Sequence, residues 1–164
     1  MGLRCYLYKK TWIDSTNLSG SINLNRIKKE ENKILELPYK FDLNRVHYII
    51  EEVGYWSHAD QIYRWFNDHV CSEPPMELGS MLYVDLNDLK KLKSNIEEIF
   101  NTPKGKLRDA KAKKLIPVDE FLSFEDNPYT EEYYDQLMDV LQVLNTALTE
   151  HDNHGCSDYY FEAD

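Results

Sequence analysis

Apolar and polar residues alternate near the start of the chain. In residues 3–12 (LRCYLYKKTW), apolar side chains stand at alternate positions, which is typical of a strand with one buried face. Residues 45–53 (RVHYIIEEV) are rich in β-branched and aromatic residues and predict a second strand. A short strand at 80–84 (SMLYV) and an edge strand at 157–164 (SDYYFEAD) complete the set. Residues 21–40 place apolar residues around a charged run, which predicts a hairpin, with a short helix as the alternative.

Three other stretches carry apolar residues at helical spacing. The first follows Ser57, whose pairing with Asp60 three residues later predicts an N-terminal cap. The second begins after Asp85, and the third begins after Pro128 with Thr130 as its cap. The three apolar stripes consist of Ala59, Ile62, Tyr63, Phe66 and Val70; of Leu89, Leu92, Ile96 and either Ile99 or Phe100; and of Tyr134, Leu137, Met138, Leu141, Leu144 and Leu148.

These elements predict an α+β fold in which a small, mainly antiparallel sheet packs against about three helices. The length of 164 residues fits a single domain over residues 1–164. Aromatic residues make up 13% of the chain, which provides ample surface for a core. No apolar run approaches the ~18 residues that span a bilayer. We therefore expect a soluble, cytoplasmic protein that does not bind membranes.

Charge is distributed very unevenly along the sequence. The net charge is −10, yet all 19 Lys and Arg lie within residues 1–114. Residues 115–164 hold 13 Asp and Glu and no Lys or Arg. Just before them, residues 104–114 (KGKLRDAKAKK) carry six basic residues and one acidic residue. Blocks of one sign steer partners. Either this basic segment neutralises the acidic one within the molecule, or the acidic segment presents one continuous anionic face to a cationic partner.

Sequence motifs for catalysis are missing. The chain has no P-loop, dinucleotide-binding, zinc-protease or nucleophile-elbow motif, and its six glycines do not cluster. Its three cysteines are widely spaced, which is typical of reduced thiols. The segment EHDNHGC at 150–156 contains metal-ligand residue types but lacks a second ligand pair, so it is interpreted as a polar helix end. We expect no cofactor and no metal.

Two local features keep other functions open. Tyr55, Trp56, His58 and Asp60 form a polar aromatic group at the start of the first helix, which could hold a small ligand or could simply pack the helix onto the sheet. Glu51 and its neighbour Glu52 point to opposite sides of a strand, so one of them could be buried with a perturbed pKa.

Several segments resemble a set of small phage and prophage proteins. Those proteins share the opening Met-Gly-Leu-x-x-Tyr-Leu stretch and a Glu-Val-Gly-Tyr-Trp motif, found here within residues 51–66. The resemblance continues through residues 83–92 and 130–144. It implies a setting in viruses and mobile elements, and it implies no activity. The chain departs from the pattern at Arg4, where the family has an acidic residue, and at Ser57, His58 and Asp60, where it has Arg, Lys and Asn.

Three functions follow from these features. The leading hypothesis is a non-enzymatic phage-type protein that binds a basic host protein through its acidic region, for instance as an inhibitor of a nucleic-acid-binding defence or replication factor. The alternative is an oligomeric protein that sequesters a small molecule or nucleotide at the Tyr55 group, and the second alternative is a minor hydrolase. Direct binding of duplex DNA is not expected, because the net charge repels phosphate. The expected partner-binding residues are Glu125, Asp126, Glu131, Glu132, Asp135 and Asp139.

Overall fold

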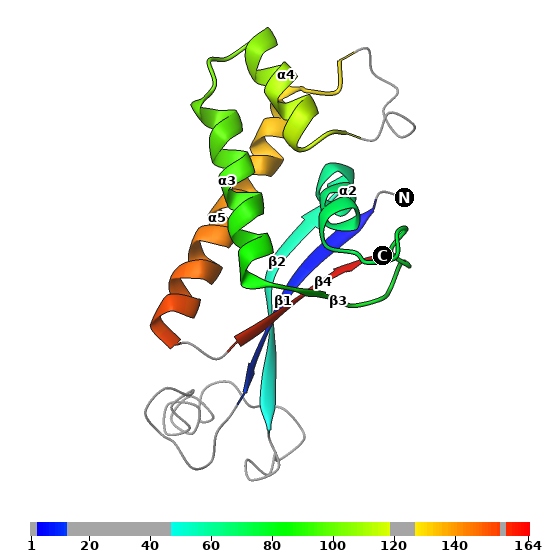
Figure 1. Ribbon diagram of the computed structural model, residues 1–164, viewed down its shortest axis with the longest axis vertical. Coiled ribbons are helices and arrows are strands. Elements are labelled where there is room, and N and C mark those ends of the chain that lie inside the picture. Colours follow the sequence, from blue (N-terminus) through cyan, green and yellow to red (C-terminus); the bar gives the residue numbers. More distant parts are fainter. Residues whose placement is uncertain (1–2, 13–46, 119–126, 155–156) are drawn as a thin grey trace, which may run out of the picture.

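A computed structural model describes residues 3–12, 47–118, 127–154 and 157–164. Within these residues the chain forms an α+β fold, with a four-stranded antiparallel sheet and four helices (Figure 1). The elements in chain order are β1 (Arg4–Trp12), β2 (Tyr48–Ser57), α2 (Asp60–His69), β3 (Leu82–Val84), α3 (Leu86–Asn101), α4 (Lys106–Leu115), α5 (Glu131–His154) and β4 (Ser157–Ala163).

The strand order is β2-β1-β4-β3, with every neighbouring pair antiparallel. The last strand, β4, therefore lies inside the sheet between β1 and β3, so the expectation of an edge strand at 157–164 was wrong. The alternation from Tyr159 to Ala163 explains which side chains of β4 enter the core, whereas its interior position comes from its pairing with both β1 and β3.

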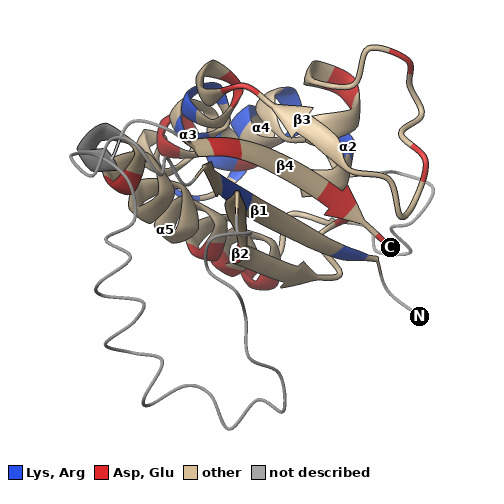
Figure 2. Ribbon diagram, turned by 90° about the horizontal axis from the view of Figure 1, so that it is seen from below, with Lys and Arg blue, Asp and Glu red and all other residues tan. Residues whose placement is uncertain are grey.

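The sheet has one buried face and one face on which none of the described helices packs. In β1, Cys5, Leu7, Lys9 and Thr11 are buried, while the residues between them are partly or fully exposed. In the view of Figure 2 the strands pass in front of the helices. We call the side of the sheet away from the helices the outer face.

Helices α2 and α5 pack on the inner face. The ring of Phe66 in α2 stacks on Phe161 of β4, with centroids 4.1 Å apart. The hydroxyl of Tyr159 in β4 donates a hydrogen bond to the backbone oxygen of Ala147 in α5, at 2.9 Å. The core thus joins the second half of α5 to the sheet, and α3 packs against α5.

The start of the first helix differs from the sequence prediction. β2 continues through Ser57, and α2 is capped by Ala59, whose side chain makes no capping bond. His58 adopts a left-handed backbone with φ 57°, and its amide donates to the oxygen of Leu3 at 2.7 Å. The expected cap by Ser57 was wrong, because the strand pairing with β1 extends to Ser57 itself.

The cap of α3 agrees with the sequence prediction. The Asp85 side chain accepts a hydrogen bond from the amide of Asn87 at 2.8 Å, as expected for the cap of α3. Helix α4 lies in the basic segment 104–114, for which no helix was predicted. The predicted hairpin at 21–40 lies outside the described residues.

Candidate functional site

Four of the expected partner-binding residues lie in the first half of α5. Glu131, Glu132, Asp135 and Asp139 are all exposed. In the parts of the chain that the structure describes, none of them forms an ion pair. The two remaining expected residues, Glu125 and Asp126, lie outside the described residues.

The packing of α5 explains why these carboxylates point away from the core. Tyr133, Leu137, Val140 and Leu144 follow one another at steps of three or four residues and are buried. The hydroxyl of Tyr133 donates to the backbone oxygen of Ile116 at 2.7 Å, and burial raises the pKa of this hydroxyl. The acidic residues occupy the remaining positions, and two of them stand in the first turn, where the helix dipole favours negative charge.

The acidic residues near the C-terminus do not form one continuous face in the described structure. Asp158, Glu162 and Asp164 belong to β4 and the residue after it, and they alternate with the buried side chains of that strand, which places them on the outer face. Asp164 pairs with Arg4 at 3.0 Å, and Glu150 of α5 pairs with Lys9 at 2.6 Å. Two acidic groups therefore exist, one on α5 and one on the outer face of the sheet.

Two cations of the basic segment, Lys111 and Arg108, bind α3 and the residue after it. Lys111 forms an ion pair with Glu98 at 2.5 Å, and this hydrogen bond lowers the pKa of the Glu98 carboxyl. Arg108 donates from Nε to the oxygen of Thr102 at 2.9 Å and from its Nη2 to the oxygen of Phe100 at 3.0 Å. These bonds satisfy backbone oxygens at the end of α3, which would otherwise lack partners.

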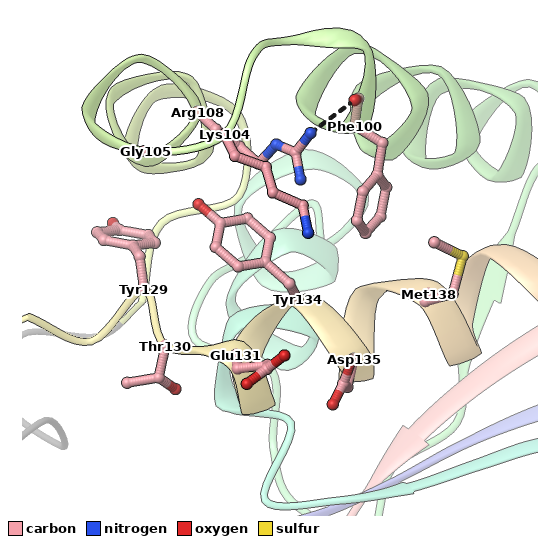
Figure 3. A pocket seen from close by; sticks show the side chains of 10 residues that line it. All are labelled: Phe100, Lys104, Gly105, Arg108, Tyr129, Thr130, Glu131, Tyr134, Asp135 and Met138. Atoms are coloured by element: carbon pink, nitrogen blue, oxygen red, sulfur yellow. Dashed lines mark hydrogen bonds between the residues drawn. The ribbon is translucent and has the colours of Figure 1, made fainter.

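A pocket of about 460 Å³ lies where the end of α3 and the beginnings of α4 and α5 meet (Figure 3). The guanidinium of Arg108 lies 5.6 Å from the ring centre of Phe100 and 5.8 Å from that of Tyr134. Figure 3 shows the Lys104 side chain reaching between these two rings, while the carboxylates of Glu131 and Asp135 lie along the opposite rim. The pocket thus combines two cationic side chains and aromatic rings with two carboxylates.

The sequence analysis missed this pocket. Arg108 and Phe100 are eight residues apart, and Tyr134 comes from a third element, so no local spacing connects them. Two features of the sequence could have pointed to such a pocket: the basic segment 104–114 and the several tyrosines at the start of α5.

The predicted aromatic group at the start of α2 is divided between the two sides of the sheet. Trp56 is only 6% exposed and belongs to the core, whereas Tyr55 lies on the outer face with its ring 5.2 Å from that of Tyr6. Asp60 is partly buried in the first turn of α2. A hollow of about 540 Å³ includes Tyr55 and His58, and its other lining residues are Leu3, Arg4, Ser57, Leu78 and Asp164.

The adjacent carboxylates Glu51 and Glu52 are both exposed, so the expectation that one of them is buried was wrong. The β1–β2 pairing is irregular here, because Leu7 pairs with Gly54 while Tyr8 pairs with Glu52. Val53 is the extra residue of this bulge. With both carboxylates in solvent, the hydrolase hypothesis loses the buried carboxylate on which it depended.

The cysteines and ligand-type residues give no further site. Cys5 is buried, and burial raises the pKa of its thiol to about 12, so it is a poor nucleophile at neutral pH. Within the described ranges, no group of three or more His, Cys, Asp or Glu is placed to hold a metal ion. The same ranges contain no helix that is long and apolar enough to cross a membrane.

Comparisons with known proteins return no match: no family model, no curated protein and no solved structure is significantly similar to this chain.

Proposed function

We propose that this protein is a non-enzymatic, phage-type binding protein that docks onto a basic host protein through the acidic surface of α5. We define this surface by Glu131, Glu132, Asp135 and Asp139. An inhibitor of a nucleic-acid-binding defence or replication factor is the function that this chemistry fits best. Such factors carry Lys and Arg in the groove that receives nucleic acid, and an acidic protein competes for the same cations.

The observation that carries the proposal is the absence of ion pairs at these four exposed carboxylates, within the described part of the chain. Carboxylates that already have an internal cation lose that partner on docking, which offsets the gain from a new one. Here the nearby cations Lys111 and Arg108 are engaged with α3. The four carboxylates are therefore without ion pairs in the described chain, and Glu132 and Asp139 also lie outside the pocket that contains Lys104 and Arg108. At physiological salt their attraction for an external cation acts over about a Debye length.

Charge reversal tests the proposal. The double variant Glu132→Lys/Asp139→Lys reverses two carboxylates that do not line the pocket of Figure 3. The tagged protein captures its partner from bacterial lysate, and the affinity for that partner is then measured at several salt concentrations. We expect the double variant to bind at least about tenfold more weakly, and wild-type binding to weaken as salt rises.

The matched control is Glu73→Lys/Glu77→Lys, which makes the same change in net charge at two exposed positions outside α5. We expect it to retain its affinity, apart from the small loss that follows from the change in total charge. If both variants bind like the wild type, or if binding is insensitive to salt, the acidic surface is not the docking site and the proposal fails.

A second candidate function, sequestration of a small molecule or nucleotide, is supported by the pocket of Figure 3. Its volume of about 460 Å³ lies within the range of small-ligand sites. Lys104 and Arg108 would bind an anionic group, and the rings of Phe100 and Tyr134 would stack on a planar one. A thermal-shift screen of nucleotides should then give a stabilisation that the exposed-site variant Lys104→Ala reduces. No stabilisation by any nucleotide would leave only the protein-binding proposal.

A further inference from the structure

The outer face of the sheet carries an unusual number of aromatic side chains. Strand register and burial place seven rings on this face. None of the described helices covers it (Figure 2). Five large apolar side chains of the face are 45–54% exposed: Trp12, Tyr48, Ile50, Tyr55 and Tyr83. The complete set of rings is Tyr6, Tyr8, Trp12, Tyr48, Tyr55, Tyr83 and Tyr160.

The rings stand in contact with one another in three clusters. Tyr6 stacks on Tyr8 with centroids 5.9 Å apart and contacts Tyr55 at 5.2 Å. The rings of Tyr83 and Tyr160 are 5.8 Å apart, and those of Trp12 and Tyr48 are 5.5 Å apart. Clustered Tyr and Trp are the side chains most enriched in the energetically dominant parts of protein interfaces. A contiguous exposed apolar area of this kind is typical of a site that binds another molecule.

The charge of the face is negative. Glu52 lies across from Tyr8, Glu162 across from Tyr6, and Asp158 across from Lys10. Arg4 is already paired with Asp164, so Lys10 is the one cation set against three carboxylates at these described positions. Burial, followed by the charges of Glu162 and Glu52, raises the pKa of the Tyr8 hydroxyl. Tyr8 therefore stays neutral, and its ring keeps a negative potential next to fixed negative charges.

One ring cluster already holds a cation. The Lys10 ammonium lies 4.2 Å from the ring centre of Trp12 and 4.2 Å from that of Tyr48. The Trp12 indole nitrogen donates to Asp158 at 2.9 Å, which ties a carboxylate to the same cluster. Two rings thus hold one ammonium group, and a carboxylate is hydrogen-bonded to one of these rings. The Tyr6/Tyr8/Tyr55 and Tyr83/Tyr160 clusters have neighbouring carboxylates of the same kind.

We propose that the outer face is a second docking surface for the basic protein partner, where a Lys- or Arg-rich segment lays its cationic groups on the Tyr6/Tyr8/Tyr55 and Tyr83/Tyr160 clusters. This inference rests on the proposed function, since it assumes the same basic protein partner. It adds to the acidic surface of α5 a second surface, whose rings recognise the shape of a cationic side chain as well as its charge. A cation over an aromatic ring contributes most when water is excluded, and a planar guanidinium also stacks on the ring. The hollow lined by Tyr55, His58 and Leu78 continues the face and gives space for one large side chain.

Charge argues against two other occupants. A single strand of nucleic acid could stack its bases on these rings, but its phosphates would lie against Glu52, Glu162 and Asp158. A second copy of the chain would bring the same carboxylates together face to face. A cationic protein segment is the occupant whose charge complements the face.

The experiment titrates the full-length ¹⁵N-labelled protein with an acetylated and amidated deca-arginine peptide at low salt. We expect shifts for amides of β1, β3 and β4 and for the Trp12 indole, in addition to any on the acidic surface of α5. The variant Tyr55→Leu/Tyr83→Leu removes two exposed rings on the edge strands while keeping apolar side chains there. Its shifts on the sheet should need a peptide concentration roughly fivefold higher or more.

The outcomes separate this inference from the proposed function. In Glu132→Lys/Asp139→Lys the sheet shifts should persist while those on α5 disappear. Shifts confined to α5 in the wild type would overturn the outer-face inference and leave the proposed function standing, whereas no shift anywhere would count against both. Unchanged sheet affinity in the Tyr55→Leu/Tyr83→Leu variant would overturn the role of the rings. Binding of a ten-nucleotide oligothymidine to the same face would show that the occupant is nucleic acid instead.

Discussion

Gly54 of β2 lies directly beneath the side chains of Trp56 and of Val143 in α5. A Cβ at this position would stand 2.6 Å from Cη2 of Trp56 and 3.0 Å from Cγ1 of Val143 in α5. Neither neighbour has free space, because both belong to or pack against the hydrophobic core. The absence of a side chain at Gly54 thus allows α5 to lie directly on β2.

We expect Gly54→Ala to destabilise the fold by about 1–3 kcal/mol, because an extra methyl group forces Trp56 or Val143 out of place. Urea denaturation monitored by tryptophan fluorescence measures the loss. Ser57→Ala, at an exposed position of the same strand, serves as the control and should cost less than about 0.5 kcal/mol. An equal effect of both substitutions would contradict the close packing of α5 on β2.

For single residues, the sequence predicted which segments form strands better than it predicted which face of the sheet each side chain occupies. The alternation around Cys5 and Leu7 predicted the buried face of β1, but the burial of Lys9 and Thr11 on the same face could not be predicted from their residue types. The extra residue at Val53 shifts the alternation of β2, and that bulge depends on the pairing with β1. Tyr55 and Trp56 face opposite sides because β2 continues through Ser57, whereas the strand predicted from the sequence ended at residue 53.

Among the elements, α4 shows where periodicity fails as a predictor. Only Ala112 of this helix is buried, so it has no apolar stripe to detect. Its signals are of another kind: Gly105 precedes it, and Lys113 and Lys114 stand in its last turn, where the helix dipole favours cations. The helix is held largely by polar contacts to α3, which a hydrophobicity pattern cannot register.

Arg108 is the main such contact, and we expect Arg108→Met to lower the free energy of unfolding by about 1–3 kcal/mol. The substitution removes both hydrogen bonds from the guanidinium to the backbone oxygens of Phe100 and Thr102. Chemical denaturation measures the effect, and Lys106→Met, at an exposed position of the same helix, is the control. Arg108→Lys should fall between the two, because an ammonium cannot make both bonds in the same geometry. A wild-type stability in Arg108→Met would show that α4 is held by other contacts.

For the molecule as a whole, net charge limits the partners. We expect no binding of duplex DNA in a mobility-shift titration at low salt, because a net charge of −10 repels phosphate. The exposed cations Lys106 and Lys114 of α4 are the local exception that such a test would detect. Salt-sensitive duplex binding that Lys106→Glu/Lys114→Glu abolishes would contradict this prediction and would reassign α4 as a nucleic-acid surface.

The basic segment 104–114 and the acidic segment 115–164 show how much of the charge distribution can be predicted from the sequence. The blocks could be found by counting charged residues along the sequence. The predicted apolar stripe of α5 was only partly right, because Met138 is exposed whereas Tyr133 and Val140 are buried. The division of acidic residues between α5 and the outer face could not be predicted, because it depends on β4 entering the sheet beside β1. Likewise, the pocket at Arg108 required three elements to meet.

The interior position of β4 has a consequence for synthesis. β1 is translated well before residues 157–163, which form its neighbour across the sheet. At about 5–20 residues per second, the intervening chain takes roughly 7–30 s to make. Throughout that interval the nascent chain carries β1 with one row of amides and carbonyls open to other strands, so its yield in the cell should depend on what shields this row until β4 has been made.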